Sequence, residues 1–307
     1  MKVFIFCIVL LSMNGFSATL VPPVTDRSWA RPKNAIVTNN MVELPANIEK
    51  FSATSFFLPV EANSIYEVCF QVSVKGESAF PGGRVAINTN MPLAYEERFL
   101  KKEPRLFRTF LFNDTKGKKW INILYRTGNP KGIMRISDLT IQKFDPKKQK
   151  KITLDEPLAW QKTSWSSPGT DFTTEPVSDH VDTTDALLLS LPSEVPDGKC
   201  TVSLRSCPIP FQPDSEYRIS AWFKGDAPGT AGLGIDCWFG KQYQHFYKGE
   251  KFTIGTKWKK YSMLLRSPSV REFPVLELQR TRGTVTLERG TPLKKLYVKN
   301  WTIEKIR

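Results

Sequence analysis

The sequence predicts an all-β protein made of two antiparallel β-sandwich domains in tandem, and three observations lead to this prediction. Apolar and polar residues alternate along segments such as 219–223 and 296–306, which is the pattern of strands that bury one face. The 22 prolines and 18 glycines punctuate the chain, and no segment after the N-terminal apolar run has a sustained apolar stripe at helical spacing. Related motifs recur on the two sides of a central basic stretch, as tandem copies of one fold would produce.

The N-terminal residues are predicted to direct export rather than to fold. An apolar run over residues 3–11 follows Lys2 and is too short to cross a bilayer as a helix. We predict a signal peptide over residues 1–17, because Gly15 and Ser17 provide small residues just before the cut. A short membrane anchor is the alternative, but no second apolar run of this length follows. The protein is therefore expected to be secreted, periplasmic or at the cell surface, with no transmembrane segment.

A basic linker is predicted over residues 146–151, which read Pro-Lys-Lys-Gln-Lys-Lys. A proline followed by charges with no apolar anchor is typical of a linker. It separates a first β-sandwich domain over residues 18–145 from a second over residues 152–307. Each of these segments is long enough to bury a core of its own.

Three pairs of segments match in the same order on the two sides of this linker, and their offsets are 149, 151 and 162 residues. The pairs are 66–76 with 217–225, 106–110 with 257–261, and 136–143 with 298–305. The drift of the offsets is what loop insertions would produce, so the matches favour tandem domains of one fold. Chance similarity among strand-rich segments is the alternative.

The cysteines and histidines do not form a recognisable metal or disulfide pattern. Four cysteines lie beyond the signal peptide: Cys69, Cys200, Cys207 and Cys237. They contain no CxxC pair, and no histidine is spaced for zinc. Buried free thiols are expected, with a single bridge from Cys237 to either Cys200 or Cys207 as the alternative.

The motifs of the second half carry a family resemblance. Residues 217–225, then Phe-Thr-Ile-Gly-Thr-Lys-Trp-Lys-Lys-Tyr at 252–261, then a final strand at 296–306 resemble the galactose-binding-like jelly rolls. More narrowly, they resemble carbohydrate-binding modules of the family 4, 9 and 22 type. The resemblance covers most of residues 152–307 and is fainter over 35–144, where Phe107 replaces the tryptophan. Such motifs mark a fold more than a ligand.

This resemblance implies a non-catalytic carbohydrate-binding protein that recognises a poly- or oligosaccharide. Modules of this kind often accompany a carbohydrate-active enzyme and often hold a structural calcium. Asp182 and Asp185 are the calcium candidates, because they lie in an acidic stretch that could supply oxygen ligands. The stretch has no loop of recognised spacing, so solvated acidic residues are the alternative, and no other cofactor is expected.

The residues also predict where a sugar would bind. A sugar ring has an apolar face and a rim of hydroxyls, so its site needs aromatic rings beside hydrogen-bonding side chains. Residues 234–247 are predicted to form a hairpin with a two-residue loop at Gly240-Lys241, which pairs Trp238 with Tyr243 and Asp236 with His245. We call the resulting surface the aromatic platform: Asp236, Trp238, Tyr243, His245 and Tyr247.

Several alternatives to the platform stay open. Trp222 is one residue out of phase with its apolar neighbours and is a candidate to extend the platform, although a buried tryptophan is the alternative. Trp238 and Tyr243 could instead form an ordinary surface pair, or point inward if the register slips by one residue. In the first domain, the alternation around Trp120 predicts no clean aromatic face, so that domain is expected to be structural.

An enzyme is not favoured, because no GxSxG, HExxH, phosphate-loop or dinucleotide-binding glycine motif occurs. The alternative functions are a jelly-roll polysaccharide lyase or hydrolase, and an adhesive or structural surface protein without glycan binding. A lyase could draw on Tyr and on basic residues, which here would be Lys241, Tyr243, Tyr247 and Arg280.

Basic residues outnumber acidic ones by 44 to 30, which gives a net charge of +14. The excess is spread along the chain rather than concentrated in one stripe, and an exported protein seldom meets nucleic acid. No nucleic-acid partner is therefore expected. The charge instead fits an acidic glycan or an envelope surface.

Overall fold

The structure is a computed structural model that describes most of the chain beyond residue 19. The described residues are 20–23, 27, 29–38, 40–46, 52–75, 84–89, 95–97, 104–113, 116–126, 131–154, 160–162, 171–178, 183–190, 202–206, 209–239, 244–267, 269, 282–289 and 293–307. The predicted signal peptide lies outside them. Within the described residues, no helix has the length and apolar character needed to cross a membrane.

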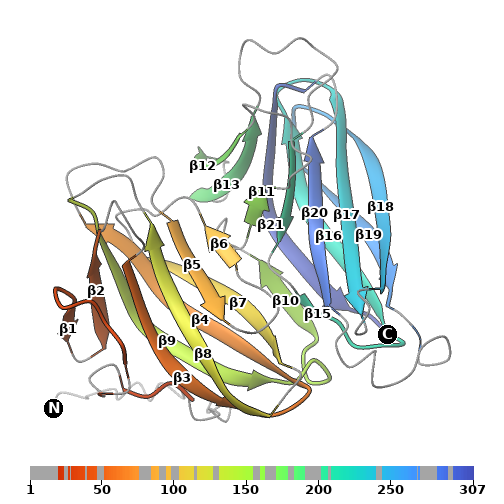
Figure 1. Ribbon diagram of the computed structural model, residues 1–307. Coiled ribbons are helices and arrows are strands. Elements are labelled where there is room, and N and C mark those ends of the chain that lie inside the picture. The colour runs from red at the N-terminus through yellow and green to blue at the C-terminus, as the bar shows by residue number, and fades with distance from the viewer. Residues whose placement is uncertain are drawn as a thin grey trace, which may run out of the picture.

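The first half of the chain forms a β-sandwich of two antiparallel sheets (Figure 1). One sheet has the strand order β1-β2-β9-β4-β7 and the other has β3-β8-β5-β6. The strands are β1 (Ile36–Thr38), β2 (Met41–Pro45), β3 (Ser52–Val60), β4 (Ser64–Lys75), β5 (Arg84–Thr89), β6 (Tyr95–Glu97), β7 (Arg105–Asn113), β8 (Gly117–Arg126) and β9 (Ile133–Phe144).

The second half forms another antiparallel sandwich. One sheet has the order β12-β13-β21-β16-β19, with β10 also paired to β21; the other has β11-β14-β20-β17-β18, with β15 also paired to β20. The strands are β10 (Lys151–Leu154), β11 (Trp160–Lys162), β12 (Asp171–Ser178), β13 (Thr183–Ser190), β14 (Val202–Ser206), β15 (Ile209–Pro210), β16 (Glu216–Gly225), β17 (Gly229–Phe239), β18 (Gln244–Ile254), β19 (Lys259–Arg266), β20 (Arg282–Arg289) and β21 (Lys295–Lys305).

The two sandwiches have the same strand order, so each strand of the first has a counterpart in the second. The sheet β1-β2-β9-β4-β7 corresponds to β12-β13-β21-β16-β19, and β3-β8-β5-β6 corresponds to β14-β20-β17-β18. This confirms the predicted fold class. Between the sandwiches, residues 145–150 form turns in which the Lys148 N–H donates to the Asp145 carbonyl at 3.1 Å.

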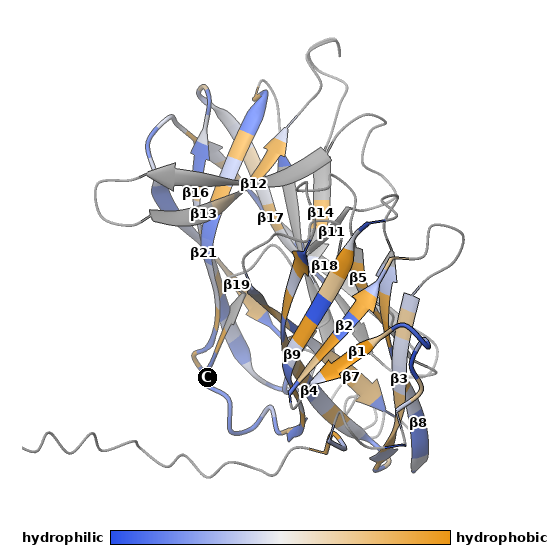
Figure 2. Cartoon of the chain, turned by 90° about the vertical axis from the view of Figure 1, so that its left-hand side faces the viewer, coloured by the Kyte–Doolittle hydropathy of each residue, from blue (hydrophilic) through white to orange (hydrophobic). Residues whose placement is uncertain are grey.

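Strand alternation builds the core of each sandwich. In β4, Tyr66, Val68 and Phe70 are buried, and in β16, Tyr217 and Ile219 are buried in the same way. Figure 2 shows apolar and polar residues alternating along β9. Burying this apolar row is the main driving force for the packing of the two sheets.

A β-bulge recurs at the same place in both sandwiches. The register between β4 and β9 shifts opposite Phe70, and the register between β16 and β21 shifts opposite Ala221. The extra residue is left-handed in each case, with φ of 54° at Asp138 and 53° at Asn300. Asp and Asn tolerate this conformation better than most residues. The predicted match of residues 136–143 with 298–305 is therefore confirmed.

Another predicted match is wrong. Phe70 pairs with Phe107, and the corresponding Ala221 pairs with Tyr261, so Phe107 corresponds to Tyr261 and not to Trp258. Trp258 precedes β19 rather than lying in it. The strand pairing, rather than the spacing of aromatic residues in the sequence, therefore identifies the counterpart of Phe107.

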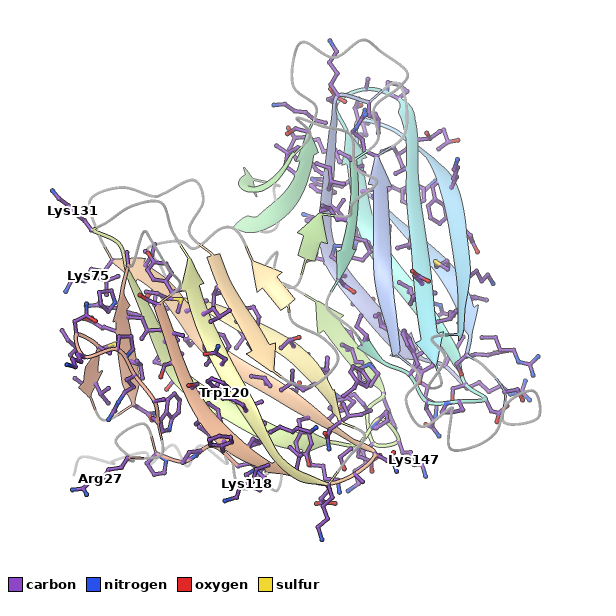
Figure 3. The ribbon with its side chains drawn as sticks, in the orientation of Figure 1. Arg27, Lys75, Lys118, Trp120, Lys131 and Lys147 are labelled. Atoms are coloured by element: carbon purple, nitrogen blue, oxygen red, sulfur yellow. The ribbon has the colours of Figure 1, made fainter. Side chains whose placement is uncertain are left out.

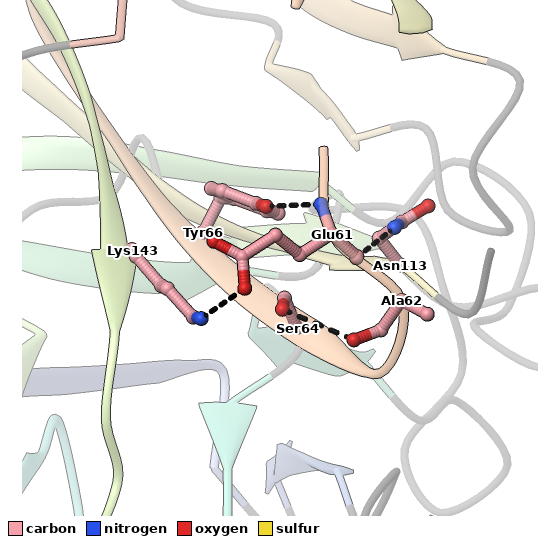
Figure 4. Close-up of polar contacts among 6 residues, drawn as sticks. All are labelled: Glu61, Ala62, Ser64, Tyr66, Asn113 and Lys143. Atoms are coloured by element: carbon pink, nitrogen blue, oxygen red, sulfur yellow. Dashed lines mark hydrogen bonds and ion pairs between the residues drawn. The ribbon is translucent and has the colours of Figure 1, made fainter. Parts of the chain in front are cut away.

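The turn before β4 is stabilised by the side chain of a buried tyrosine (Figure 4). The Glu61 N–H donates to the Tyr66 hydroxyl oxygen at 2.8 Å, and Asn113 Nδ2 donates to the Glu61 carbonyl at 2.5 Å. Lys143 Nζ lies 2.6 Å from Glu61 Oε2. Asn63 takes a φ of 52° in the turn between them.

The turn before β16 repeats this arrangement with different side chains. The Gln212 N–H donates to the Tyr217 hydroxyl oxygen at 2.8 Å, and Ser267 Oγ donates to the Gln212 carbonyl at 2.6 Å. Lys305 Nζ donates to Gln212 Oε1 at 2.5 Å, and Asp214 takes a φ of 53°. We call these two arrangements the tyrosine corners of the first and second domains.

Candidate functional site

Four of the five predicted platform positions lie in β17 and β18, on the outer face of the sheet β11-β14-β20-β17-β18. In β17, Leu233 and Ile235 are fully buried against the core. Strand alternation therefore places Gly234 and Asp236 on the opposite, outer face, where Asp236 is half-buried. The neighbouring position on this face, two residues further along β17, is Trp238.

The register of the β17–β18 hairpin differs from the prediction. Asp236 pairs with Tyr247 and Trp238 pairs with His245, and residues 240–243 connect the strands. The predicted two-residue loop at Gly240-Lys241 is therefore wrong, and the pairing is shifted by two residues. A shift of two preserves the face, whereas a shift of one would have reversed it.

The corrected register still brings four of the platform positions together. Asp236, Trp238, His245 and Tyr247 occupy adjacent positions across two neighbouring strands on one face. Tyr243 lies outside the described residues. The structure thus describes the backbone arrangement of these four positions, and the role of their side chains stays a prediction.

Trp222 does not extend this surface. It lies on β16, in the sheet β12-β13-β21-β16-β19, where it pairs with Lys260 and Lys299. Its half-buried side chain is therefore on the other outer face of the sandwich from Asp236. The prediction that Trp222 adds to the platform is wrong, because alternation along one strand cannot show to which sheet the strand belongs.

Two glycine positions lie beside Asp236 in this sheet. Gly234 pairs with Gly249 on β18 and with Thr286 on β20, so two of these three adjacent positions have no side chain. Asp236 pairs with Thr284 on β20. The face therefore combines the buried Gly234 and the exposed Gly249 with carboxylate and hydroxyl positions.

The first domain carries an exposed aromatic pair that the sequence did not reveal. Phe57 and Trp120 pair across β3 and β8, and their rings stack with centroids 6.4 Å apart and planes at 30°. Their side chains are 59% and 49% exposed. Figure 3 shows Trp120 on the side of the first domain that carries this sheet. The expectation that the first domain lacks an aromatic face is wrong.

Polar positions lie beside this pair on the same outer face. Ile121 and Ile123 are buried against the core, so Trp120 and Asn122 share the outer face of β8. Asn122 pairs with Ser55 on β3 and with Asn88 on β5. The first domain therefore offers stacked rings next to a row of hydrogen-bonding positions.

The metal and cysteine predictions stay largely untested. Asp182 lies outside the described residues, and of Asp185 only the backbone position in β13 is described. Where residues are described, no three His, Cys, Asp or Glu side chains come together. Cys69 is a free, half-buried thiol, and burial is the main reason that its pKa is raised to about 11. Cys200 and Cys207 lie outside the described residues.

The comparisons with known proteins give matches only among solved structures. No family model matches the chain, and no curated protein sequence matches it. The matched structures include the N-terminal CBM22-1-CBM22-2 tandem domain from Paenibacillus barcinonensis Xyn10C, with 12% identity and a TM-score of 0.36. That match covers 95% of this chain and 97% of the tandem domain.

Two further matches cover about half of this chain. The family 11 carbohydrate-binding module of the Clostridium thermocellum cellulosomal cellulase Lic26A-Cel5E has 15% identity and a TM-score of 0.34, over 51% of this chain and 95% of the module. The C-terminal family 22 module of Clostridium thermocellum Xyn10B has 10% identity and a TM-score of 0.34, over 49% and 88%. These are modules of the class that the sequence motifs resemble.

Proposed function

We propose that this protein is a non-catalytic carbohydrate-binding protein that binds saccharides on the outer faces of two corresponding sheets. The observation that carries the proposal is the solvent-exposed Phe57–Trp120 pair of the first domain. The resemblance of the sequence motifs to carbohydrate-binding modules supports the same class of ligand.

Exposed stacked rings need a physical reason. Large aromatic side chains gain free energy when they leave water, so a pair held open to solvent commonly marks an interaction surface. The apolar face of a pyranose ring can stack on such rings, while its hydroxyls bond to neighbouring polar groups. Asn122 is placed to supply one of these groups beside Trp120.

In the second domain, the proposal assigns binding to the aromatic platform of Asp236, Trp238, Tyr243, His245 and Tyr247. The exposed Gly249 on β18 would let a saccharide approach the backbone of the sheet. Export of the protein, a structural calcium and association with a carbohydrate-active enzyme belong to the same proposal.

Affinity electrophoresis of the full chain against a panel of soluble polysaccharides tests the proposal. Trp120→Ala and Trp238→Ala are each expected to weaken retention of the protein by at least about tenfold in affinity, because aromatic side chains dominate binding surfaces of this kind. The measured quantity is the polysaccharide concentration that halves the mobility.

Matched controls remove similar side chains from the opposite faces. Leu106→Ala removes an exposed apolar side chain from β7, and Trp222→Ala removes a tryptophan from β16. Both are expected to leave retention unchanged. If the parent protein is not retarded by any glycan, the proposal is refuted and the adhesive or structural alternative is favoured. Release of soluble sugar by the protein would instead favour the lyase or hydrolase alternative.

A further inference from the structure

A cavity of about 930 Å³ lies at the junction of the two domains. We call it the junction cavity. The turn before β4, the turns at 145–148 and the tyrosine corner of the second domain all contribute to its lining. Figure 3 shows Lys147 at the end of the first domain that lies nearest the second. The cavity is therefore a feature of the tandem arrangement and not of either sandwich alone.

The lining of the junction cavity is predominantly basic. Its cationic side chains are those of Lys143, Lys147, Lys148, Lys305 and Arg307. The acidic side chains in the lining are Asp145 and Asp214. One oxygen of Asp145 is already used as the acceptor for the backbone N–H of Lys147, at 3.0 Å.

The two tyrosine corners differ in how they neutralise their lysine. Lys143 forms an ion pair with Glu61, so its positive charge is balanced locally. Lys305 instead donates to the neutral amide of Gln212, and among the residues that the structure describes no carboxylate lies within ion-pair distance of it. The amide orients the Lys305 ammonium without cancelling its charge. The second corner therefore presents an oriented, uncompensated cation to the cavity.

We propose that the junction cavity binds the carboxylate or sulfate groups of an acidic saccharide. An oriented ammonium with further lysines around it suits an anionic oxygen group, and its three N–H donors exceed the single bond made to Gln212. The cavity volume is in the range of sites that hold small molecules. For its ligand class the inference rests on the proposed function, and it assigns the acidic part of that ligand to the junction.

Two reciprocal substitutions at the corners test this site in the full chain. Gln212→Glu copies the carboxylate of the first corner into the second and pairs Lys305, whereas Glu61→Gln does the reverse and leaves Lys143 with a neutral partner. Both changes preserve side-chain size. In calorimetric titrations with tetragalacturonate at about 200 mM salt, Gln212→Glu is expected to weaken binding about threefold to tenfold, and Glu61→Gln to strengthen it.

The control variant is Lys75→Gln. It changes the net charge by the same amount as Gln212→Glu, but Lys75 lies at the other end of the first domain from Lys147 (Figure 3). It is expected to leave tetragalacturonate binding within about twofold of the parent at about 200 mM salt, where charges further apart than about 8 Å are screened. An equal effect of Lys75→Gln and Gln212→Glu would overturn the site, because only the total charge would then matter.

Further probes separate the ligand sources and the two proposals. A sulfated galactose tetramer reports on sulfate, and the neutral galactose tetramer should be indifferent to both corner substitutions. Inorganic sulfate that binds as tightly as the acidic tetramers would overturn the saccharide assignment. If Trp120→Ala abolishes saccharide retention while Gln212→Glu leaves acidic binding unchanged, the proposed function stands and the junction site is refuted. If no saccharide binds the parent, both are refuted.

Discussion

The two tyrosine corners show which parts of a repeated structure are fixed and which are exchangeable. Both corners keep the buried tyrosine that accepts a backbone N–H, at Tyr66 and Tyr217, with the same 2.8 Å distance. Both also have a left-handed residue two positions after that N–H. The polar side chain beside the lysine differs between the corners: it is the carboxylate of Glu61 in the first and the amide of Gln212 in the second.

This difference shows that the geometry of the turn does not depend on the charge of the side chain beside the lysine. In each turn the N–H and the carbonyl of one residue, Glu61 or Gln212, bond to side chains, so the turn depends on these side chains. Asn113 and Ser267 both donate to the turn carbonyl, although one is an amide and the other a hydroxyl. The corner therefore requires a donor of the right reach, but it does not require an ion pair. The charge of the Lys305 ammonium is therefore available for binding an anion in the junction cavity.

The largest expected effect concerns Gly225, which occupies the position of Val74 in the first domain. Val74 is buried, but a Cβ at Gly225 would lie 2.6 Å from the Ala227 carbonyl oxygen and 2.8 Å from Leu293 Cδ2. Gly225→Val should therefore force the backbone to move and destabilise the second domain by about 3 kcal/mol or more. Urea unfolding followed by tryptophan fluorescence measures this loss. The reference is Val74→Ala, which leaves a small gap instead; a Gly225→Val protein as stable as the parent would contradict the correspondence.

The tyrosine hydroxyls predict the next largest effect. Tyr66→Phe and Tyr217→Phe each leave a backbone N–H of the turn without its acceptor, so each should destabilise the protein by about 1 to 2 kcal/mol. The two losses are expected to agree within about 0.5 kcal/mol, because the corners are geometrically alike and each tyrosine hydroxyl accepts from a residue of its own turn. Thermal unfolding of the two single variants and the double variant measures this. Markedly unequal losses would break the comparison between the domains.

Much of the fold could be predicted from the sequence, because strand alternation is a local signal. The alternation at Ile219, Ala221 and Phe223 correctly indicated a strand with one buried face. The tyrosine corners left a signal that was missed, since Glu-Ala-Asn-Ser-Ile-Tyr at 61–66 corresponds to Gln-Pro-Asp-Ser-Glu-Tyr at 212–217, just before the matched segments begin. Residues that tolerate a left-handed backbone occupy the third position in both.

The candidate sites depended on information that is not local. The Phe57–Trp120 pair forms across two strands that lie far apart in the chain, so neither strand alone indicates it. The sheet to which Trp222 belongs follows from the topology and not from alternation. The hairpin register failed because Gly240-Lys241 resembles a two-residue turn, whereas the connection spans 240–243. The predicted positions still share one face only because the error in the register was an even number of residues.

Replacing Glu61 by glutamine should have a small effect on stability. The Glu61–Lys143 ion pair is solvent-exposed, with 66% and 52% of the side chains accessible, so its loss should cost about 0.5 kcal/mol or less. The hydrogen bond to Glu61 raises the pKa of Lys143 above its ordinary value of 10.5. The stabilisation is therefore fully present below pH 10.5 and is lost as the pH rises through the raised pKa. The difference between parent and Glu61→Gln in urea should vanish there; a difference that persists would contradict the ion-pair origin.

The last comparison is between Cys69 and its counterpart Ser220, and it predicts a difference in chemical reactivity rather than in stability at neutral pH. The Ser220 hydroxyl lies 2.8 Å from that of Ser262, whereas burial raises the pKa of the Cys69 thiol from 9.0 to about 11. At pH 7 the thiol is protonated in the folded and unfolded states alike, so its ionisation contributes nothing to the stability of the protein. Above pH 9 the thiol deprotonates first in the unfolded state, so the stability of the protein falls as the pH rises to about 11. The folded protein should therefore alkylate at Cys69 about a hundredfold more slowly at pH 7 than the urea-unfolded chain, since the thiolate is the nucleophile. Mass spectrometry of iodoacetamide-treated protein measures both rates, and equal rates would show that the thiol is not held in the buried, protonated state that distinguishes it from Ser220.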